Sequence, residues 1–207
     1  MISLFIDTSL TNVSISVLKD GKILSLISKE IPNMHSALVT KFIKDTLDES
    51  KIDANDIDNL MVVNGPGSFT GVRIGVTIAK TYGYLIKKEI IPISSLKSLA
   101  ISANHDNNIM SIIPANKSSY YVGIYDNKLN EIIKEECMSK EKIVSLCNEY
   151  NPYIVGTDTS IIGTYKIHRQ ELDIPKIVDY YIGKEKVNYY KLVPNYLKLP
   201  QALEGKK

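Results

Sequence analysis

The sequence predicts an α/β fold made of two similar subdomains, each with the order β-β-β-α-β. Two observations support this prediction. Three strand-like segments open the chain and are followed by a helical pattern and a further apolar run. The same order returns in the second half without an obvious repeat of the sequence itself. The polar run His105–Asn108 separates the two sets, so we expect one subdomain over residues 1–104 and a second, shortened one over residues 105–207.

The first subdomain is expected to open with a meander of three strands. Leu4–Ile6 is a short apolar run, and Val13–Val17 alternates apolar and polar side chains as a half-buried strand does. Lys19–Lys22 contains an Asp-Gly pair, which tolerates the positive φ angles of a tight hairpin turn. Ile23–Ile27 then continues as the third strand.

The rest of this half alternates helices and strands. Apolar residues recur at helical spacing over Met34–Leu47, where they mark one face of an amphipathic helix. The other expected elements are a helical turn over Asp53–Asn59, strands over Leu60–Val63 and Ile90–Ile93, a helix over Val72–Ile86, and a helix capped by Ser94 that ends near Ala103.

The second half repeats this pattern with shorter elements. We expect strands over Ile109–Ile113, Tyr120–Tyr125 and Leu129–Glu135, a helix over Ser139–Tyr150, and a strand over Tyr153–Val155. Three prolines cut the region Thr159–Leu203 into short pieces, in which we expect one short helix near Asn188–Lys191.

Composition indicates a folded globular protein, either an enzyme or a partner protein. The 207 residues are 44% hydrophobic and 23% charged, which is ordinary for a packed domain. The 25 Lys and Arg residues against 23 Asp and Glu residues give a net charge of +2, so no basic face for autonomous nucleic-acid binding is expected. A role beside an RNA would therefore depend on partner proteins.

Cysteine spacing and the first residues predict a cytoplasmic protein. Cys137 and Cys147 are too far apart for a CxxC pair, so we expect free, reduced thiols. The opening segment MISLFID has no basic region, and Asp7 interrupts its apolar run before a signal segment or a membrane span is reached.

The glycine-rich turn NGPGSFTGVRIG, residues 64–75, fails the tests for three known motifs. A dinucleotide site needs an acidic residue at the end of the next strand, where this chain has Ser94, and Pro66 removes a backbone N–H. A P-loop needs Lys and Ser or Thr where Val72 and Arg73 stand. A nucleophile elbow needs glycines two residues on either side of Ser68.

The backbone of the turn offers a simpler chemistry. Gly67, Ser68, Thr70 and Gly71 at a helix start would present N–H groups and hydroxyls that suit an anion, a carbonyl or a neighbouring loop. They could equally well only make the turn and cap the helix.

The helix after this turn carries a stripe of small residues. Gly71, Gly75, Ala79 and Gly83 recur every four residues, although a glycine inside a helix costs roughly 1 kcal/mol relative to alanine. This indicates a close backbone approach, either to the chain's own sheet or first helix or to a helix of another subunit. If the stripe lies in the core, Tyr82 and Tyr84 remain on the sides of the helix for an interface.

A third observation narrows the architecture. Asp7, Thr8 and Ser9 follow the first strand and precede a strand, a turn and another strand. A carboxylate and hydroxyls in this position are typical of the first phosphate loop of actin-like ATPases. Together with the doubled strand order, they predict an actin-like ATPase fold (ASKHA, ribonuclease H-like).

Five segments of the chain resemble the bacterial TsaB family. They are LFIDTSLTNVSISVLKDGK at residues 4–22, HSALVTKFI at 35–43, GPGSFTGVRIGVTIAK at 65–80, IPISSLKSLA at 91–100 and VPNYLKLPQA at 193–202. The resemblance spans nearly the whole chain, and the block at 65–80 is highly specific. It implies two actin-like domains and a non-catalytic activating or scaffold subunit of the machinery that makes threonylcarbamoyladenosine beside the anticodon of certain tRNAs.

The resemblance also implies a catalytic paralogue, TsaD, which transfers the threonylcarbamoyl group from an adenylate to tRNA with the help of a metal ion. In that paralogue, two histidines four residues apart bind the metal within a stretch similar to residues 91–100. The corresponding positions here are Ser95 and Leu99, and leucine cannot coordinate a metal. We therefore expect no catalytic residue and no metal ligand in this chain.

The implied partners are a TsaD-like paralogue, a TsaE-like ATPase and, when the chain is alone, a second copy. TsaC or a relative supplies the adenylate, tRNA is the substrate of the complex, and ATP or ADP and a metal ion are expected in the partner subunits. The implied contact surface is formed by the helices over residues 35–47 and 72–86. The predicted partner interface consists of His35, Leu38, Val39, Phe42, Gly71, Val72, Gly75, Val76, Ala79 and Tyr82, and the predicted anion-like turn of Asp7, Thr8, Ser9, Gly67, Ser68, Thr70 and Arg73.

Two other classes of function stay open at the level of sequence. A metal-dependent hydrolase of the glycoprotease type would need a metal site or a nucleophile, and neither is recognisable in the sequence. A stand-alone actin-like protein would bind ATP without partners.

Overall fold

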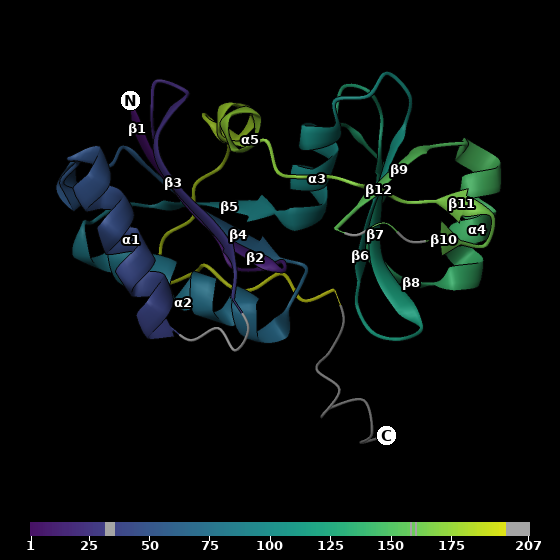
Figure 1. Cartoon of the computed structure of the whole chain (residues 1–207), viewed down its shortest axis with the longest axis horizontal. Helices are drawn as coiled ribbons and strands as arrows, with labels where there is room; N and C mark the ends of the chain where they lie inside the picture. Colours follow the sequence, from purple (N-terminus) through teal and green to yellow (C-terminus); the bar gives the residue numbers. More distant parts are fainter. Residues whose placement is uncertain (32–35, 158, 160, 198–207) are drawn as a thin grey trace. The chain divides into compact units, whose positions relative to one another are not determined.

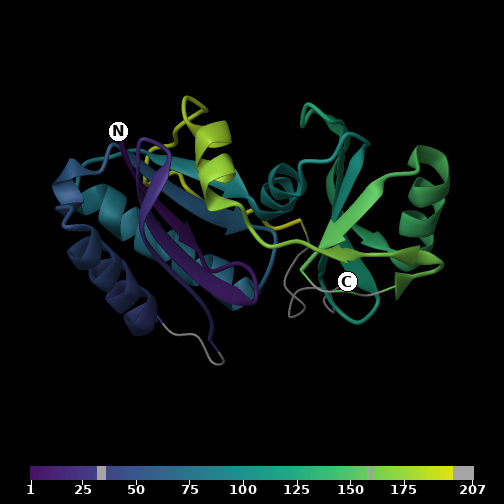
Figure 2. The same cartoon turned by 45° about the horizontal axis from the view of Figure 1, so that its top comes forward.

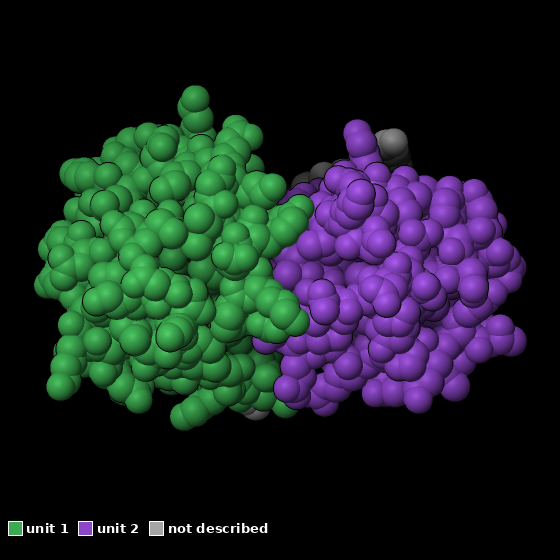
Figure 3. Space-filling view, turned by 90° about the horizontal axis from the view of Figure 1, so that it is seen from above, with its two compact units in different colours: residues 1–95, 173–194 green, residues 96–172, 195–207 purple. Residues whose placement is uncertain are grey.

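Two five-stranded sheets form the framework of the chain (Figure 1). The structure is a computed structural model that describes residues 1–31, 36–157, 159 and 161–197. The chain divides into two compact units (Figure 3). Unit 1 consists of Met1–Ser95 and Asp173–Pro194, and unit 2 consists of Leu96–Leu172 with the described residues from Asn195 on.

The sheet of unit 1 has the strand order β3-β2-β1-β4-β5. An antiparallel meander is made by β1 (Ile2–Asp7), β2 (Asn12–Lys19) and β3 (Lys22–Glu30). On its other side β1 pairs in parallel with β4 (Asn59–Gly65), which pairs in parallel with β5 (Ile90–Ser94). The carboxyl ends of these three parallel strands therefore lie at one edge of the sheet.

Helices cover both faces of this sheet (Figures 1 and 2). One face is covered by α1 (Ser36–Ser50) and α2 (Phe69–Leu85), and the other by α5 (Ile174–Tyr181). The apolar sides of α1 and α2 pack on the alternate residues of the strands that point toward them. The centre of this core contains Leu4, Ile6, Val13, Ile15, Val39, Ile43, Leu60, Val62, Val72 and Val76.

The sheet of unit 2 has the order β12-β9-β6-β7-β8. Its antiparallel meander is made by β6 (Ile109–Pro114), β7 (Ser119–Tyr125) and β8 (Glu131–Ser139). Parallel to β6 lie β9 (Tyr153–Gly156) and then β12 (His168–Arg169). Helix α4 (Lys140–Tyr150) packs on this sheet. The remaining elements are α3 (Ser95–Ala103), a short 3-10 helix at Ala54–Asp56, and the hairpin of β10 (Ile161–Ile162) and β11 (Tyr165–Lys166).

The two sheets repeat one topology. In each, the first strand of an antiparallel meander also pairs in parallel with the strand that comes after the next helix. This confirms the predicted α/β class with two similar β-β-β-α-β sets in an actin-like, ribonuclease H-like arrangement. No helix in the described part is both long and apolar enough to cross a membrane.

The division between the units differs from the predicted boundary at residue 104. The first segment of unit 1 ends at Ser95, and the unit also includes residues 173–194. The reason is that this late segment adds to the first sheet: Ile90 and Val187 exchange backbone hydrogen bonds of 2.9 and 2.8 Å, and Lys186 Nζ donates to Asn59 Oδ1 at 3.0 Å.

Helix α5 lies in the region where the sequence predicts only short pieces cut by prolines. Pro175 does not break this helix but occupies its first turn, where a missing N–H costs nothing. The Asp173 carboxylate caps the same turn by accepting from the Lys176 N–H at 3.2 Å.

The prediction of a short helix at Asn188–Lys191 is wrong, because the structure has a turn there. Asn188 Oδ1 accepts from the Tyr190 N–H at 3.0 Å, and the Asn188 carbonyl accepts from the Lys191 N–H at 2.8 Å. An asparagine side chain that bonds two residues onward stabilises a turn and competes with helix growth.

Candidate functional site

The residues of the predicted anion-like turn come from the carboxyl ends of the parallel strands in unit 1. Asp7 ends β1 and is followed by Thr8 and Ser9, whereas Gly67 and Ser68 follow β4. Because β1 and β4 pair in parallel, the sheet brings these two segments together. The structure thus joins two motifs that lie about sixty residues apart in the sequence.

The Asp7–Ser9 loop is buried and bonded internally. Asp7 Oδ1 accepts hydrogen bonds from the Ser9 N–H at 2.8 Å and from the Ser9 hydroxyl at 2.7 Å. Burial disfavours the ionised carboxylate and raises the pKa of Asp7 to about 6, although the two bonds from Ser9 act in the opposite direction. The carboxyl group of Asp7 is therefore protonated more easily than an ordinary aspartate.

The Asp7–Ser9 loop packs against the glycine-rich turn and the start of α2 and forms hydrogen bonds with them. The Ser68 N–H donates to the Ser9 carbonyl at 2.8 Å, and the Thr8 hydroxyl donates to the Gly71 carbonyl at 2.7 Å. Ser68 also caps α2, since its Oγ accepts from the Gly71 N–H at 3.2 Å. Of the three ligands that the turn could suit, an anion, a carbonyl or a neighbouring loop, the contacts show a neighbouring loop of the same chain.

Gly67 and the first two glycines of the stripe, Gly71 and Gly75, are explained by the same close approach. A Cβ atom on Gly67 would lie 2.2 Å from the Ser9 carbonyl oxygen, and one on Gly71 would lie 2.0 Å from the Thr8 carbonyl oxygen. A Cβ on Gly75 would lie 2.4 Å from Thr8 Oγ1. Glycine is required at these positions because the backbone of α2 packs directly on the first loop.

The prediction that this stripe meets another subunit is therefore corrected. Most of the predicted interface lies inside the core of unit 1, because the small-residue stripe of α2 faces the sheet and the first loop. The buried residues of the predicted interface are Val39 and Phe42 of α1 and Gly71, Val72, Gly75, Val76 and Ala79 of α2. Leu38 and Tyr82 are half-buried at the edge of this core, and burial raises the pKa of Tyr82. His35 lies outside the described residues.

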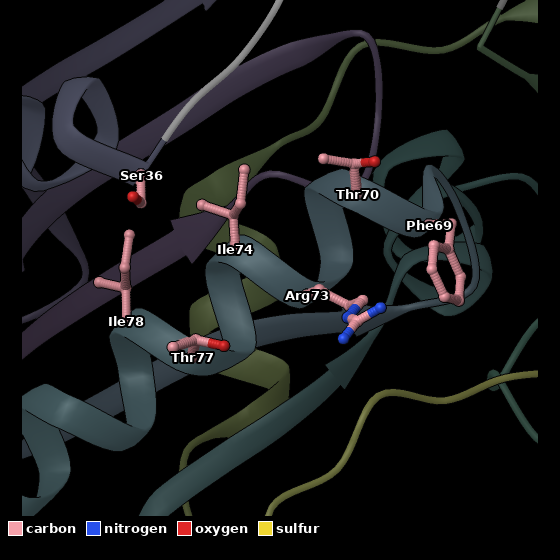
Figure 4. A pocket seen from close by; sticks show the side chains of 7 residues that line it. All are labelled: Ser36, Phe69, Thr70, Arg73, Ile74, Thr77 and Ile78. Atoms are coloured by element: carbon pink, nitrogen blue, oxygen red, sulfur yellow. The ribbon is translucent and has the colours of Figure 1, made fainter.

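A second side of α2 lines a groove, in which Phe69, Thr70, Arg73 and Thr77 are exposed, whereas Ile74 is half-buried and Ile78 is buried (Figure 4). Its walls are formed by Phe69, Thr70, Arg73, Ile74, Thr77 and Ile78 from α2 and by Ser36 from the start of α1, around a space of about 310 Å³. Ile74 and Ile78 extend from α2 toward Ser36, and Phe69 and Arg73 lie at the other end of the groove.

One end of this groove carries a positive charge. The Arg73 guanidinium carbon lies 5.1 Å from the centre of the Phe69 ring, a cation–π contact. Within the described residues Arg73 makes no ion pair, and Phe69 is 42% exposed. Thr70 and Arg73, which the sequence places in the anion-like turn, thus belong to the groove and not to the buried loop.

Sequence reasoning missed Phe69 because it started the helix at Val72, and it missed Ile74, Thr77 and Ile78 because it followed only the small-residue stripe of that helix. From the true start at Phe69, residues 70, 74 and 78 succeed one another at helical spacing, as do 69, 73 and 77. An earlier helix start, signalled by Ser68 as N-cap, would have added Phe69 and Thr70 to this second face.

The two positions that match the metal-binding histidines of the paralogue are both inside the fold. The Ser95 hydroxyl donates to the Pro66 carbonyl, and Leu99 is completely buried. Within the described ranges, no three His, Cys, Asp or Glu side chains are grouped as metal ligands.

Burial raises the pKa of the Cys147 thiol to about 11, which keeps it protonated near neutral pH.

Comparison with known proteins identifies the family. Residues 28–188 match the family model described as TsaD, tRNA N6-adenosine threonylcarbamoyltransferase. A Bacillus subtilis protein named tRNA threonylcarbamoyladenosine biosynthesis protein TsaB is 30% identical, over 98% of this chain and 96% of its own length. The chain belongs to the TsaB family. The resemblance noted in the sequence is thereby confirmed.

Other TsaB-family members and a solved structure agree with this assignment. The Haemophilus influenzae TsaB protein is 29% identical over 74% of this chain and 71% of its own length. A crystal structure of an uncharacterised Pseudomonas aeruginosa protein with similarity to the peptidase YeaZ superposes with a TM-score of 0.80, covering 95% of this chain and 99% of that one. At 21% identity this match shows that the two proteins share a fold.

Proposed function

We propose that this chain is a non-catalytic subunit that supports threonylcarbamoyl transfer to tRNA adenosine by binding the transferase paralogue through the α2 groove. The main support for this proposal is the groove, because it is lined by side chains of the segment that resembles the TsaB family most specifically. Membership of that family supplies the pathway, since its curated relatives are named as tRNA threonylcarbamoyladenosine biosynthesis proteins.

The shape and chemistry of the groove suit a helix of another protein. Ile74 and Ile78 offer an apolar floor, and Phe69 offers an aromatic side chain at one end. Aromatic and arginine side chains are enriched among the residues that dominate binding energy at interfaces. The partner helix should place an apolar side chain between the isoleucines and a carboxylate beside Arg73.

The transferase paralogue is the partner that the fold favours. The family model that matches residues 28–188 of this chain is that of a transferase, and this range includes α1 and α2. Two related chains that meet through corresponding helices form a contact with approximate two-fold symmetry, which is a common way for subunits to associate.

The catalytic steps belong to the partners in this proposal. Ser95 is engaged with the Pro66 carbonyl and Leu99 has no ligand atom, so these positions cannot reproduce the histidine pair of the transferase. The metal ion and ATP or ADP are carried by partner subunits. This chain positions and stabilises the transferase without touching the reacting atoms.

A pair of matched substitutions tests the proposal. Ile74→Glu buries a charge in the groove, and we expect it to weaken binding to the purified transferase paralogue by about 100-fold in calorimetry. The control, Ile132→Glu, changes an isoleucine that is 37% exposed on β8 of unit 2 and should leave binding unchanged. Thermal unfolding shows whether both variants are folded. Binding of folded Ile74→Glu as tight as wild type would rule out the groove.

A further inference from the structure

A group of tyrosine rings lies at the carboxyl end of α2 in unit 1. The centre of the Tyr84 ring lies 5.9 Å from that of Tyr189 and 6.4 Å from that of Tyr190, and the centres of the last two rings are 4.6 Å apart. Tyr84 and Tyr190 are 48 and 68% exposed. Exposed aromatic rings that gather in one place indicate a binding surface, whereas scattered ones do not.

Several contacts hold these rings in place. Lys80 Nζ of α2 donates to the carbonyls of Tyr190 and Leu192 at 3.3 and 3.1 Å, which fixes the late segment to the helix. Gly83, the last glycine of the α2 stripe, leaves room for Tyr189, because a Cβ atom on Gly83 would lie 3.1 Å from the Tyr189 Cβ. The surface is therefore formed in advance, so a ligand that binds here does not have to order it.

Lysines surround the aromatic rings. Lys87 Nζ lies 4.0 Å from the centre of the Tyr84 ring. The two segments that carry these residues, 80–91 and 186–193, contain five lysines and one acidic residue. Lys87 and Lys191 are exposed, and within the described part of the chain neither forms an ion pair. The nearly balanced charge of the whole chain thus conceals a local excess of positive charge at this face.

Exposed rings and lysines in this combination suit unpaired nucleic acid. Bases stack on aromatic side chains, and lysines contact the phosphates between the bases. Tyr190 has the most exposed of the three rings, whereas Lys87 already covers one face of Tyr84. We infer that this tyrosine–lysine surface binds unpaired nucleotides of RNA, with one base stacked on Tyr190 and phosphates beside Lys87 and Lys191. The choice of RNA over DNA rests on the proposed function, which places the chain beside tRNA.

Substitutions of Tyr190 test the stacked base on the purified chain. The probe is a labelled, unpaired RNA of mixed sequence and about twelve nucleotides, followed by fluorescence anisotropy. We expect a dissociation constant of about 10–100 µM at about 50 mM salt. Tyr190→Leu should weaken binding by about tenfold because it removes the ring, whereas Tyr190→Phe keeps the ring and should stay within about twofold of wild type. Both variants keep an apolar side chain, so a partner that needs only apolar contact would not distinguish them.

Substitutions of the lysines test the phosphate contacts. Two such contacts predict that the logarithm of the binding constant falls with the logarithm of the salt concentration with a slope of about −1.4. Lys87→Asn and Lys191→Gln should each reduce this slope by about 0.7 and weaken binding by about fivefold. Asparagine suits the left-handed backbone at Lys87, where φ is 55°. The control Lys134→Gln, at an exposed lysine on β8 of unit 2, should leave binding unchanged.

Three further measurements separate this surface from other contacts. Duplex RNA of the same length should bind at least about fivefold more weakly, because its bases are already stacked on one another. Ile74→Glu should change RNA affinity by less than about threefold, so a failure of the α2 groove to bind the transferase leaves this inference intact. Equal binding of duplex and unpaired RNA, equal losses for Tyr190→Leu and Tyr190→Phe, or no binding at all would overturn the inference. A DNA strand of the same sequence that binds more tightly would overturn the choice of RNA.

Discussion

The two units share one sheet topology but differ in the segment attached after the parallel partner of the first strand. In unit 1, β4 leads into the seventeen-residue helix α2. In unit 2, β9 is followed by the hairpin β10–β11, whose strands have two residues each, and the described part contains no helix before β12. The groove of unit 1 is lined mainly by this long helix. Repeating a topology therefore does not repeat a site, because the site depends on the segments attached to the sheet.

The first loops of the two units differ in the same way. In unit 1, the loop after β1 bonds to the turn before α2 through Thr8 and Ser9. In unit 2, the loop after β6 closes on itself, since Asn116 Oδ1 accepts from the N–H groups of Ser118 and Ser119, each at 2.9 Å. The loop of unit 1 thus holds α2 in place, and the loop of unit 2 is a self-contained turn.

The largest effect is expected where α2 meets the first loop. Gly71→Ala would force a Cβ atom to within 2.0 Å of the Thr8 carbonyl oxygen, so backbone must move, at a cost of about 3–5 kcal/mol in the free energy of unfolding. Its counterpart Gly163→Ala, in the β10–β11 hairpin, meets the Val144 side chain at 3.0 Å with φ of +63°. It should cost only about 1–2 kcal/mol. Urea unfolding measures both, and equal costs would contradict the contrast between the two units.

The buried carboxyl group of Asp7 predicts a dependence on pH. Burial raises the pKa of folded Asp7 from 3.8 to about 6, so protonation stabilises the fold: this contribution is complete below pH 3.8 and is lost as the pH rises through 6. Asp7→Asn stays neutral. Its stability relative to wild type should therefore increase by up to about 3 kcal/mol between pH 4 and pH 7, measured by urea unfolding.

An exposed carboxylate of unit 2 provides the control for this pH dependence. Hydrogen bonds from the Asn130 side chain and backbone lower the pKa of Asp126, so its contribution is present above pH 3.8 and is lost as the pH falls through the lowered value. Asp126→Asn should therefore show no trend between pH 4 and pH 7, and a trend of the opposite sign below about pH 4. An Asp7→Asn difference that does not change with pH would contradict the raised pKa.

The smallest effects concern two buried hydroxyls. Thr8→Val removes the bond to the Gly71 carbonyl and should lower the free energy of unfolding by about 1–2 kcal/mol. Ser111 Oγ, buried in β6 of unit 2, has no hydrogen-bond partner within the described part. Ser111→Ala should therefore be neutral or stabilising by up to about 1 kcal/mol. Thermal unfolding measures the stability change of each variant. A stabilising effect of Thr8→Val would contradict the conclusion that the first loop holds α2 in place.

Local signals in the sequence predicted the elements that depend on local chemistry. Asp20 and Gly21 have φ angles of 50° and 76°, as the Asp-Gly hairpin required. The helix predicted over Ser139–Tyr150 is α4, and Ser139 is its N-cap, accepting from the Lys142 N–H. The doubled strand order could be predicted from hydrophobic patterning alone.

Long-range packing could not be predicted in this way. The spacing of Gly71, Gly75 and Ala79 indicated a close approach but not its partner, which is the loop at Thr8, more than sixty residues away in the chain. The pairing of Val187 with Ile90 of β5 could not be predicted from the sequence either, because a single backbone bridge leaves no periodic pattern of side chains. Pro175 was ambiguous because proline both breaks helices and begins them.

Hydrogen–deuterium exchange on the complex with the purified transferase paralogue tests whether the transferase binds at the α2 groove. We predict slower exchange in residues 69–85 of α2 and at the start of α1 from Ser36 when the transferase is added, with no change in the β10–β11 hairpin of unit 2. Protection confined to unit 2, or a complex that leaves the exchange of α2 unchanged, would contradict it.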